Sequence, residues 1–220
     1  AGGILASLAA GNAVILKPAK RAISCAYLLC QCIWAAGIPK DALQLVPSDS
    51  DTYSEFLKQP SHFKSVILTG GTETADYLLH SNPRLNLYAE TGGKNATIVT
   101  SFADKELAIK HVLDSAFNNA GQKCSATSLL ILEEEVYHDK HFLRLLKDAA
   151  KSRKVGTPWQ LNTQIGPLAN PLEPKIEKEL KDTSNHWLVK GVSKDSHFLS
   201  PCIIERANSE DTHVKNELFG

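Results

Sequence analysis

The sequence predicts an α/β fold whose first part is a parallel, doubly wound sheet. Short β-branched and apolar runs alternate there with amphipathic stretches of helical length, and the links between them are short. Strand, helix and strand joined in this way imply right-handed crossovers, which place neighbouring strands parallel to each other. Ligands of such sheets bind beyond the carboxyl ends of the strands, so we expect functional residues at those ends.

The elements expected before residue 91 alternate regularly, after an opening AGGILASLAA that reads as helix. Strands are expected at residues 13–17, 43–46, 65–68 and 85–88, and helices at residues 21–36, 51–57 and 72–80. The helix at residues 21–36 ends at a Gly-Ile-Pro sequence, because glycine and proline terminate helices.

Two features of this part are candidates for cofactor binding. The turn TGGT at residues 69–72 follows the third strand, where backbone N–H groups can approach a phosphate at a helix N-terminus. Without a G-x-G-x-x-G fingerprint, the same turn is also consistent with a plain helix start. Lys17, at the end of the first strand, fits either a ligand of ribose hydroxyls or a solvated lysine.

The pattern changes after Glu90, so we place the boundary there, between a cofactor-binding lobe (residues 1–91) and an α/β catalytic lobe (residues 92–220). The second lobe is expected to have strands at residues 95–99, 128–132, near 187 and at 198–204. Helices are expected at residues 104–118, 138–151 and 176–182, with a polar, proline-rich region at 156–174. Both lobes are expected to be incomplete, since the chain opens in a helix and stops at NELFG.

Composition excludes several classes of partner. The chain has 220 residues, 43% of them hydrophobic, with 24 basic and 24 acidic side chains, so no basic surface for nucleic acid is expected. No apolar run is long enough for a membrane span. Five irregularly spaced cysteines indicate reduced thiols in a cytoplasmic protein, and no metal site is expected.

The run FNNAGQKCSATS at residues 117–128 places Cys124 in a turn of small and polar residues, beside Lys123. A nearby positive charge and backbone N–H donors favour the thiolate, so Cys124 is expected to be the most reactive thiol of the chain. The other cysteines are expected to be inert and buried, because their neighbours are apolar: Cys25, Cys30, Cys32 and Cys202.

Glu90 stands directly before the Thr-Gly-Gly of residues 91–93, where the backbone can bend sharply and leave a carboxylate free of a sheet face. Such a carboxylate can serve as a general base. A cap or an ion pair with a neighbouring lysine is an equally good interpretation of the residue alone.

Six motifs together resemble those of the aldehyde dehydrogenase superfamily in order and spacing: AGNAVILKPA, GIPKDALQLV, LTGGTETA, YAETGGKNATIV, AGQKCSA and ELFG. The resemblance covers essentially the whole chain, and Glu90 and Cys124 are 34 positions apart, as are the family's glutamate and cysteine. AETGGKNA with AGQKCSA is most similar to the Δ1-pyrroline-5-carboxylate dehydrogenase branch, which includes the dehydrogenase domain of bifunctional proline utilization A proteins.

The resemblance implies an oxidation of an aldehyde, most similar to that of glutamate γ-semialdehyde, to a carboxylate. Cys124 would be the nucleophile that forms a thiohemiacetal and then a thioester, and Glu90 the base that activates the hydrolytic water. The family's cofactor is NAD, and the matching cofactor and substrate positions are Lys17 (adenosine ribose), Gly71 (pyrophosphate), Glu217 and Phe219 (nicotinamide ribose and ring) and Ser125 (substrate carboxylate).

Two departures from the family pattern bear on the cofactor: Lys20 leaves it open between NAD and NADP, and Gly71 removes one side-chain contact to the pyrophosphate, which backbone donors could replace. Lys20 stands where many NAD-using members have a glutamate for the ribose hydroxyls, and Gly71 where many relatives have serine. A cation at Lys20 could tolerate a 2′-phosphate.

Other readings of the motifs remain open. They are another aldehyde or semialdehyde dehydrogenase, acyl-phosphate reduction through the same thiol, and a catalytically silent structural or binding relative. The presence of Glu90 favours hydrolysis of a thioester over acyl transfer. The resemblance also implies a homo-oligomeric full-length enzyme and an inactive isolated segment, since it places an oxyanion-hole asparagine before the first residue.

Overall fold

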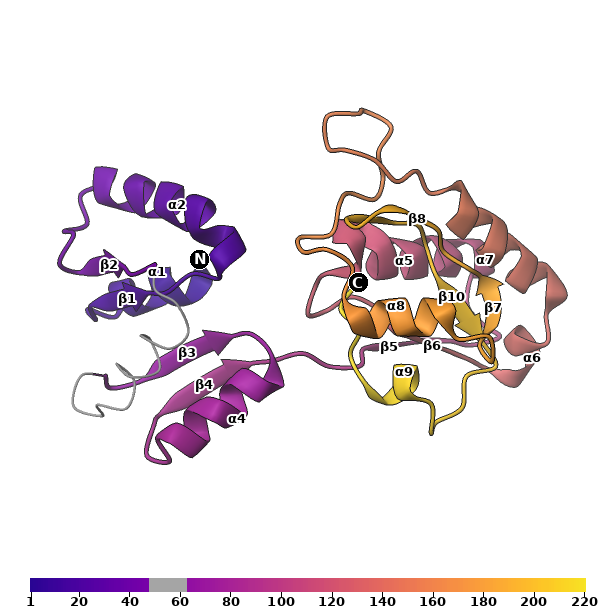
Figure 1. Cartoon of the computed structure of the whole chain (residues 1–220), viewed down its shortest axis with the longest axis horizontal. Helices are drawn as coiled ribbons and strands as arrows, with labels where there is room; N and C mark the ends of the chain where they lie inside the picture. Colours follow the sequence, from indigo (N-terminus) through magenta and orange to yellow (C-terminus); the bar gives the residue numbers. More distant parts are fainter. Residues whose placement is uncertain (48–62) are drawn as a thin grey trace. The chain divides into compact units, whose positions relative to one another are not determined.

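The computed structural model describes residues 1–47 and 63–220, which form two compact units, Ala1–Thr91 and Gly92–Gly220 (Figure 1). Both units contain parallel strand pairs together with helices, as an α/β fold requires. The helix expected at residues 51–57 lies outside the described residues. No helix of the described residues is long and apolar enough to cross a membrane.

The first unit contains two pairs of parallel strands within its described residues. Strand β1 (Val14–Leu16) pairs with β2 (Leu43–Leu45), and β3 (Val66–Thr69) pairs with β4 (Leu87–Glu90). The helical elements are α1 (Gly2–Ala9), the 3-10 turn η1 (Lys20–Ala22), α2 (Ile23–Ala35) and α4 (Thr72–Ser81). In each pair a helix lies in the connection between the two strands, consistent with the expected crossovers.

Helix α2 packs on the first strand pair through Cys30 and Ile33, which contact the buried Leu43 of β2. Its other side is exposed, and Cys25 and Cys32 lie there, two turns apart. The prediction that these two cysteines are buried was therefore wrong. Because α2 is apolar around most of its circumference, its sequence does not indicate which face packs on the sheet.

The second unit is built around the parallel pair β5 (Ala96–Val99) and β6 (Leu129–Leu132), which are connected through α5 (Lys105–Phe117). The remaining helices are α6 (Glu134–Tyr137), α7 (Lys140–Ser152), α8 (Pro174–Lys181) and α9 (Thr212–Lys215). Two antiparallel pairs complete it: β7 (His186–Val189) with β10 (Ile203–Glu205), and β8 (Ser193–Asp195) with β9 (Phe198–Leu199).

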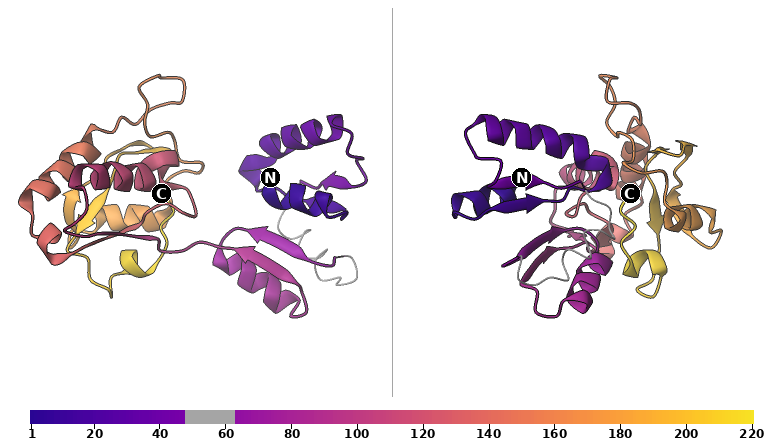
Figure 2. Two further views of the ribbon diagram at one scale, coloured as in Figure 1. Left: turned by 180° about the vertical axis from the view of Figure 1, so that it is seen from behind. Right: turned by 60° about the vertical axis from the view of Figure 1, so that its left-hand side comes forward.

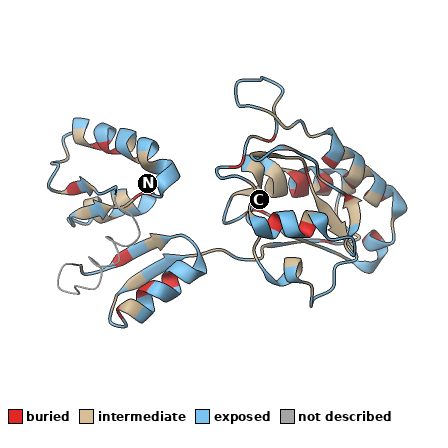
Figure 3. Cartoon of the chain, in the orientation of Figure 1, coloured by how far each residue is buried: buried red, intermediate tan, exposed pale blue. Residues whose placement is uncertain are grey.

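Helices α5 and α7 lie side by side and enclose the main core of this unit (Figures 1 and 2). Their buried residues include Leu113, Phe142 and Leu146, and Figure 3 shows buried positions in red on both helices. Replacing a buried phenylalanine such as Phe142 by alanine would cost about 3–5 kcal/mol of stability. This core supports β5 and β6, and the turn that contains Cys124, called the cysteine turn below, leads into β6.

Asp139 fixes the start of α7 and ties it to α5. Its carboxylate accepts the N–H groups of His141 (2.9 Å) and Phe142 (3.2 Å) and lies 2.7 Å from the ammonium of Lys105. The hydrogen bond from Lys105, followed by those from the helix N-terminus, lowers the pKa of Asp139.

Most expected elements are found within a few residues of their predicted ends, and the main difference lies near the carboxyl end. The single strand expected at residues 198–204 is two strands, β9 and β10, separated by Ser200, Pro201 and Cys202. Proline lacks the N–H group needed for a strand ladder, which explains the interruption.

Candidate active site

Cys124 lies in a turn between the 3-10 element η2 (Asn118–Gly121) and β6. The N–H of Lys123 donates to the carbonyl of Gly121 (3.0 Å), and the N–H of Ala126 donates to that of Lys123 (3.1 Å). Cys124 and its neighbour Ser125 are exposed, whereas Ala126 is buried and anchors the turn. The thiol is therefore presented at the surface of the second unit by a fixed backbone.

The backbone before this turn adopts an uncommon conformation. Asn119, Ala120 and Gly121 have φ values of 55°, 54° and 71°, in the left-handed region that favours glycine. A non-glycine residue there costs roughly 1–2 kcal/mol. The chain thus stores strain just before Cys124, as functional sites often do.

Asn95, just before β5, holds the cysteine turn in place. Its side-chain amide donates to the carbonyl of Cys124 (2.6 Å) and to that of Ala126 (3.0 Å). Its own carbonyl accepts the N–H groups of Ser128 and Leu129, both at 3.0 Å. The sequence alone assigns Asn95 no role, although it lies inside the motif YAETGGKNATIV.

The carboxy-terminal segment, residues 216–220, lies against the cysteine turn. The side-chain amide of Gln122 donates to the carbonyl of Phe219 (3.3 Å), and its oxygen accepts the N–H of Ala169 (2.9 Å). A side chain at Gly121 would meet the backbone of Gly220 at 3.2 Å, so the two backbones approach closely. The second unit therefore brings the turn with Cys124 against the segment with Phe219.

Glu217, in the same segment, is half-buried. Its carboxylate occupies the space that a side chain at Gly92 would need. Its backbone carbonyl accepts a hydrogen bond from the ammonium of Lys175, at 3.1 Å. The ammonium of Lys94 donates to the carbonyl of Asn216 (3.3 Å). Burial lowers the pKa of Lys94, and the negative charge of Glu217 partly opposes this shift.

In the first unit, Glu90 is the last residue of β4 and stands opposite Thr69. The N–H of Gly70 donates to the Glu90 carbonyl (3.1 Å), so the exposed Glu90 lies beside the turn of residues 69–72, called the glycine turn below. Among the described residues, its carboxylate takes part in no hydrogen bond or ion pair. Glu90 is thus neither a cap nor an ion-pair partner within the described part of the chain.

Gly71 directly precedes α4, with an extended backbone (φ −73°, ψ 153°) and no side chain capping the helix. The first N–H groups of α4 therefore receive no hydrogen bond from a capping side chain, as at helix starts that bind anions. Glu73 in the first turn would have to move aside for a phosphate, because its carboxylate lies 2.9 Å from the position of a Cβ on Gly71. Lys17, half-buried, follows the last residue of β1.

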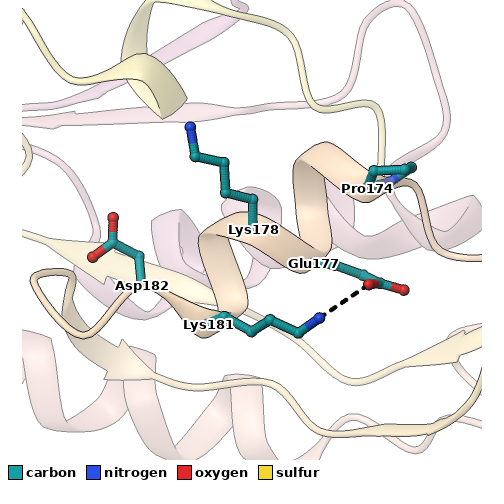
Figure 4. A pocket seen from close by; sticks show the side chains of 5 residues that line it. All are labelled: Pro174, Glu177, Lys178, Lys181 and Asp182. Carbon is teal, nitrogen blue, oxygen red and sulfur yellow. Dashed lines mark hydrogen bonds and ion pairs between the residues drawn. The ribbon is translucent and has the colours of Figure 1, made fainter.

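A surface depression on α8 contains none of the predicted site residues (Figure 4). It is lined by Pro174, Glu177, Lys178, Lys181 and Asp182, and Glu177 pairs with Lys181 at 3.2 Å. Within residues 1–47 and 63–220, no cluster of three or more His, Cys, Asp or Glu side chains could hold a metal ion.

The sequence profile of the aldehyde dehydrogenase family matches residues 1–220, and the chain belongs to this family. It is 36% identical to the bifunctional protein PutA of Klebsiella aerogenes and 32% identical to the 1-pyrroline-5-carboxylate dehydrogenase of Staphylococcus saprophyticus. Both alignments cover the whole chain, but only 18% and 45% of these two relatives.

Solved structures give the same result. Proline utilization A from Corynebacterium freiburgense matches all of the chain with a TM-score of 0.92 and 38% identity, over 23% of its own length. A point mutant of Thermus thermophilus 1-pyrroline-5-carboxylate dehydrogenase matches 99% of the chain with a TM-score of 0.88 and 28% identity, over 44% of its own length. These comparisons confirm the predicted family and its α/β fold.

Proposed function

We propose that this chain contributes the nucleophile and base of an aldehyde dehydrogenase that oxidises glutamate γ-semialdehyde, the open form of Δ1-pyrroline-5-carboxylate, to glutamate in the cytoplasm. The observation that carries the proposal is the exposed Cys124 thiol on a turn held by Asn95 and Gln122. The family match supports aldehyde oxidation, and the names of the relatives PutA and 1-pyrroline-5-carboxylate dehydrogenase support the substrate.

In the proposed reaction the Cys124 sulfur attacks the aldehyde carbon, and the carbonyl oxygen becomes the oxyanion of a thiohemiacetal. Loss of hydride from that carbon leaves a thioester. Glu90 takes a proton from water, which attacks the thioester carbon and releases the carboxylate and the thiol. The nicotinamide cofactor supplies the hydride acceptor when bound.

The residues present fit NAD in two respects. The uncapped N-terminus of α4 at Gly71 can receive the pyrophosphate, and Lys17 would contact the adenosine ribose. The segment of Glu217 and Phe219, fixed by Lys175 and Gln122, would contact the nicotinamide ribose and ring. Lys20 is exposed at the start of η1, where it could also meet the 2′-phosphate of NADP.

The proposal is tested in a full-length polypeptide that carries these 220 residues, because the chain spans less than half of its relatives. Cys124→Ala should abolish nicotinamide reduction with the semialdehyde. Cys32→Ala is the matched control, since Cys32 is also an exposed thiol but lies on α2. Full activity in Cys124→Ala would overturn the proposal.

The substrate is tested separately, with and without the α-carboxylate that Ser125 would bind. The kcat/KM for glutamate γ-semialdehyde should be higher than that for an aldehyde of equal length without the α-carboxylate. Without that carboxylate, the polar groups that would bind it are left unpaired. Equal values for the two aldehydes would reduce the proposal to an aldehyde dehydrogenase of another substrate.

A further inference from the structure

Glu179 on α8 and His213 on α9 form a side-chain pair at hydrogen-bond distance inside the second unit. The imidazole Nδ1 lies 3.2 Å from a carboxylate oxygen of Glu179, and only 12% of the His213 side chain and 11% of the Glu179 side chain are exposed. Asn185 donates its amide to the same carboxylate oxygen at 3.2 Å and to the Glu179 carbonyl at 3.0 Å. Among the residues that the structure describes, Glu179 is the one charged residue that is buried.

Other charges surround this pair. The carboxylate of Asp211 lies 3.8 Å from Nε2 of His213, which is buried and makes no hydrogen bond. Asp182 at the end of α8 and Lys94 beside β5 also lie within electrostatic range of His213 and Glu179, respectively. Because desolvation offsets most of the attraction in a buried pair, its best-attested role is to fix one arrangement of the chain.

The arrangement that the pair fixes is that of α9. This helix has four residues and none of them is fully buried, so apolar packing does little to hold it. The N–H of Asn216 donates to the carbonyl of Thr212 (2.9 Å), which closes the helix directly before Glu217. A displacement of His213 would therefore be transmitted to the segment at residues 216–220.

Helix α8 holds this segment at a second point. Lys175 and Glu179 are four residues apart and share one face of α8. Lys175 binds the Glu217 carbonyl at 3.1 Å, and Glu179 binds His213. Glu177 and Lys181 lie on a different face and pair with each other at the surface, as Figure 4 shows.

We propose that Glu179 and His213 are positioning residues for the cofactor: their buried pair docks α9 on α8 and so holds Glu217 and Phe219 where the nicotinamide ribose and ring bind. This inference rests on the proposed function, because it takes the cofactor-binding role of Glu217 and Phe219 from it. Neither residue of the pair is expected to touch the cofactor.

The experiment uses the full-length polypeptide with three variants: Glu179→Gln, His213→Gln and a transposed variant, Glu179→His with His213→Glu. The transposed variant also carries Asp211→Asn, because the Asp211 carboxylate lies 3.8 Å from His213 Nε2 and would repel a glutamate at that position. KM for NAD, kcat and the NAD dissociation constant from calorimetry are measured. A fourth readout is hydrolysis of p-nitrophenyl acetate without NAD, which requires the Cys124 thiol but no hydride transfer. The matched controls are Glu177→Gln on the exposed face of α8 and Lys215→Gln on α9, whose partner Glu210 is exposed.

Each single variant should raise KM and the dissociation constant for NAD about tenfold or more, since misplaced contacting groups cost this much. Ester hydrolysis should stay within about twofold, and the transposed variant should recover most of the affinity, because it restores the contact between an imidazole and a carboxylate. NAD affinity that is unchanged in the single variants would overturn the inference. So would a parallel loss of ester hydrolysis, which would indicate general disruption of the unit.

The outcomes also separate the inference from the proposed function. If the single variants fail to fold, the transposed variant decides: normal folding with weak NAD binding overturns the inference, and restored binding supports it. A parent protein that binds NAD but oxidises no aldehyde overturns the proposed reaction alone. A parent protein that binds neither NAD nor NADP overturns both.

Discussion

The cysteine turn and the glycine turn before α4 are both placed at the end of regular elements, but they are fixed by different means. Side-chain hydrogen bonds between residues distant in sequence hold the cysteine turn: Asn95 is 29 residues from Cys124, and Gln122 is 97 residues from Phe219. The glycine turn is fixed by backbone structure on either side of it: by the register of β3 with β4, and by the start of α4.

This difference indicates how each region tolerates change. The geometry of the cysteine turn depends on a few named side chains, so their removal should displace the thiol. The glycine turn depends on backbone geometry and on the strands beside it, so the functions proposed for it depend on Glu90 and on the uncapped N–H groups of α4. The predictions below test this contrast in the full-length polypeptide, from the largest expected effect to the smallest.

Glu90→Gln should have the largest effect, because it removes a proton acceptor and keeps the shape of the side chain. Turnover should fall by about 10²–10⁴, while a burst of reduced nicotinamide persists, since only thioester hydrolysis is slowed. Stopped-flow absorbance measures both. Glu73→Gln, beside the same turn, serves as control, and unchanged turnover in Glu90→Gln would exclude Glu90 as the base.

Asn95→Ala should lower kcat by about 10²-fold, because the Cys124 and Ala126 carbonyls lose the amide that holds the turn. Cofactor affinity should change far less. Asn12→Ala is the control: that amide binds a backbone carbonyl, that of Ser7 at 3.3 Å, in the first unit. Wild-type kcat in Asn95→Ala would mean that the turn keeps its geometry without this side chain.

Gly92→Ala should weaken NAD binding about tenfold, since an added Cβ would overlap the Glu217 carboxylate and displace it. Gly93→Ala is a close control, because a Cβ there meets only the Asn95 side-chain oxygen, at 3.9 Å. Calorimetric titration with NAD compares the two variants. Equal affinities would show that the position of Glu217 does not matter for the cofactor.

The sequence was most informative where structure is local. The helix predicted at residues 72–80 is α4 (Thr72–Ser81), and the strand predicted at 128–132 is β6 (Leu129–Leu132), because periodicity and end signals lie within each segment. The six motifs identified the family, which the profile match confirms. The roles predicted for Cys124, Glu90 and the cofactor residues stay predictions.

Features that depend on distant contacts could not be predicted. Asn95 and Gln122 lie inside motifs, yet nothing local shows which carbonyls their amides bind. The exposed face of α2 was misassigned because the helix's own residues are apolar around most of its circumference. The left-handed residues before the cysteine turn carry no sequence signal at Ala120, since alanine gives no sign of a positive φ.

The smallest expected effect concerns this strain. Ala120→Gly should relieve a left-handed alanine, a gain of roughly 1–2 kcal/mol, against an entropic cost of roughly 0.5–1 kcal/mol for glycine in the unfolded chain. The net change is a stabilisation of up to about 1.5 kcal/mol, measured by urea unfolding. Ala108→Gly, inside α5, is the matched control and should destabilise by about 1 kcal/mol, because its backbone is helical. The sign difference between the two variants is the decisive result. Destabilisation by Ala120→Gly as large as that by Ala108→Gly would show that residue 120 bears no strain, and that contacts of the alanine methyl group hold this part of the turn instead.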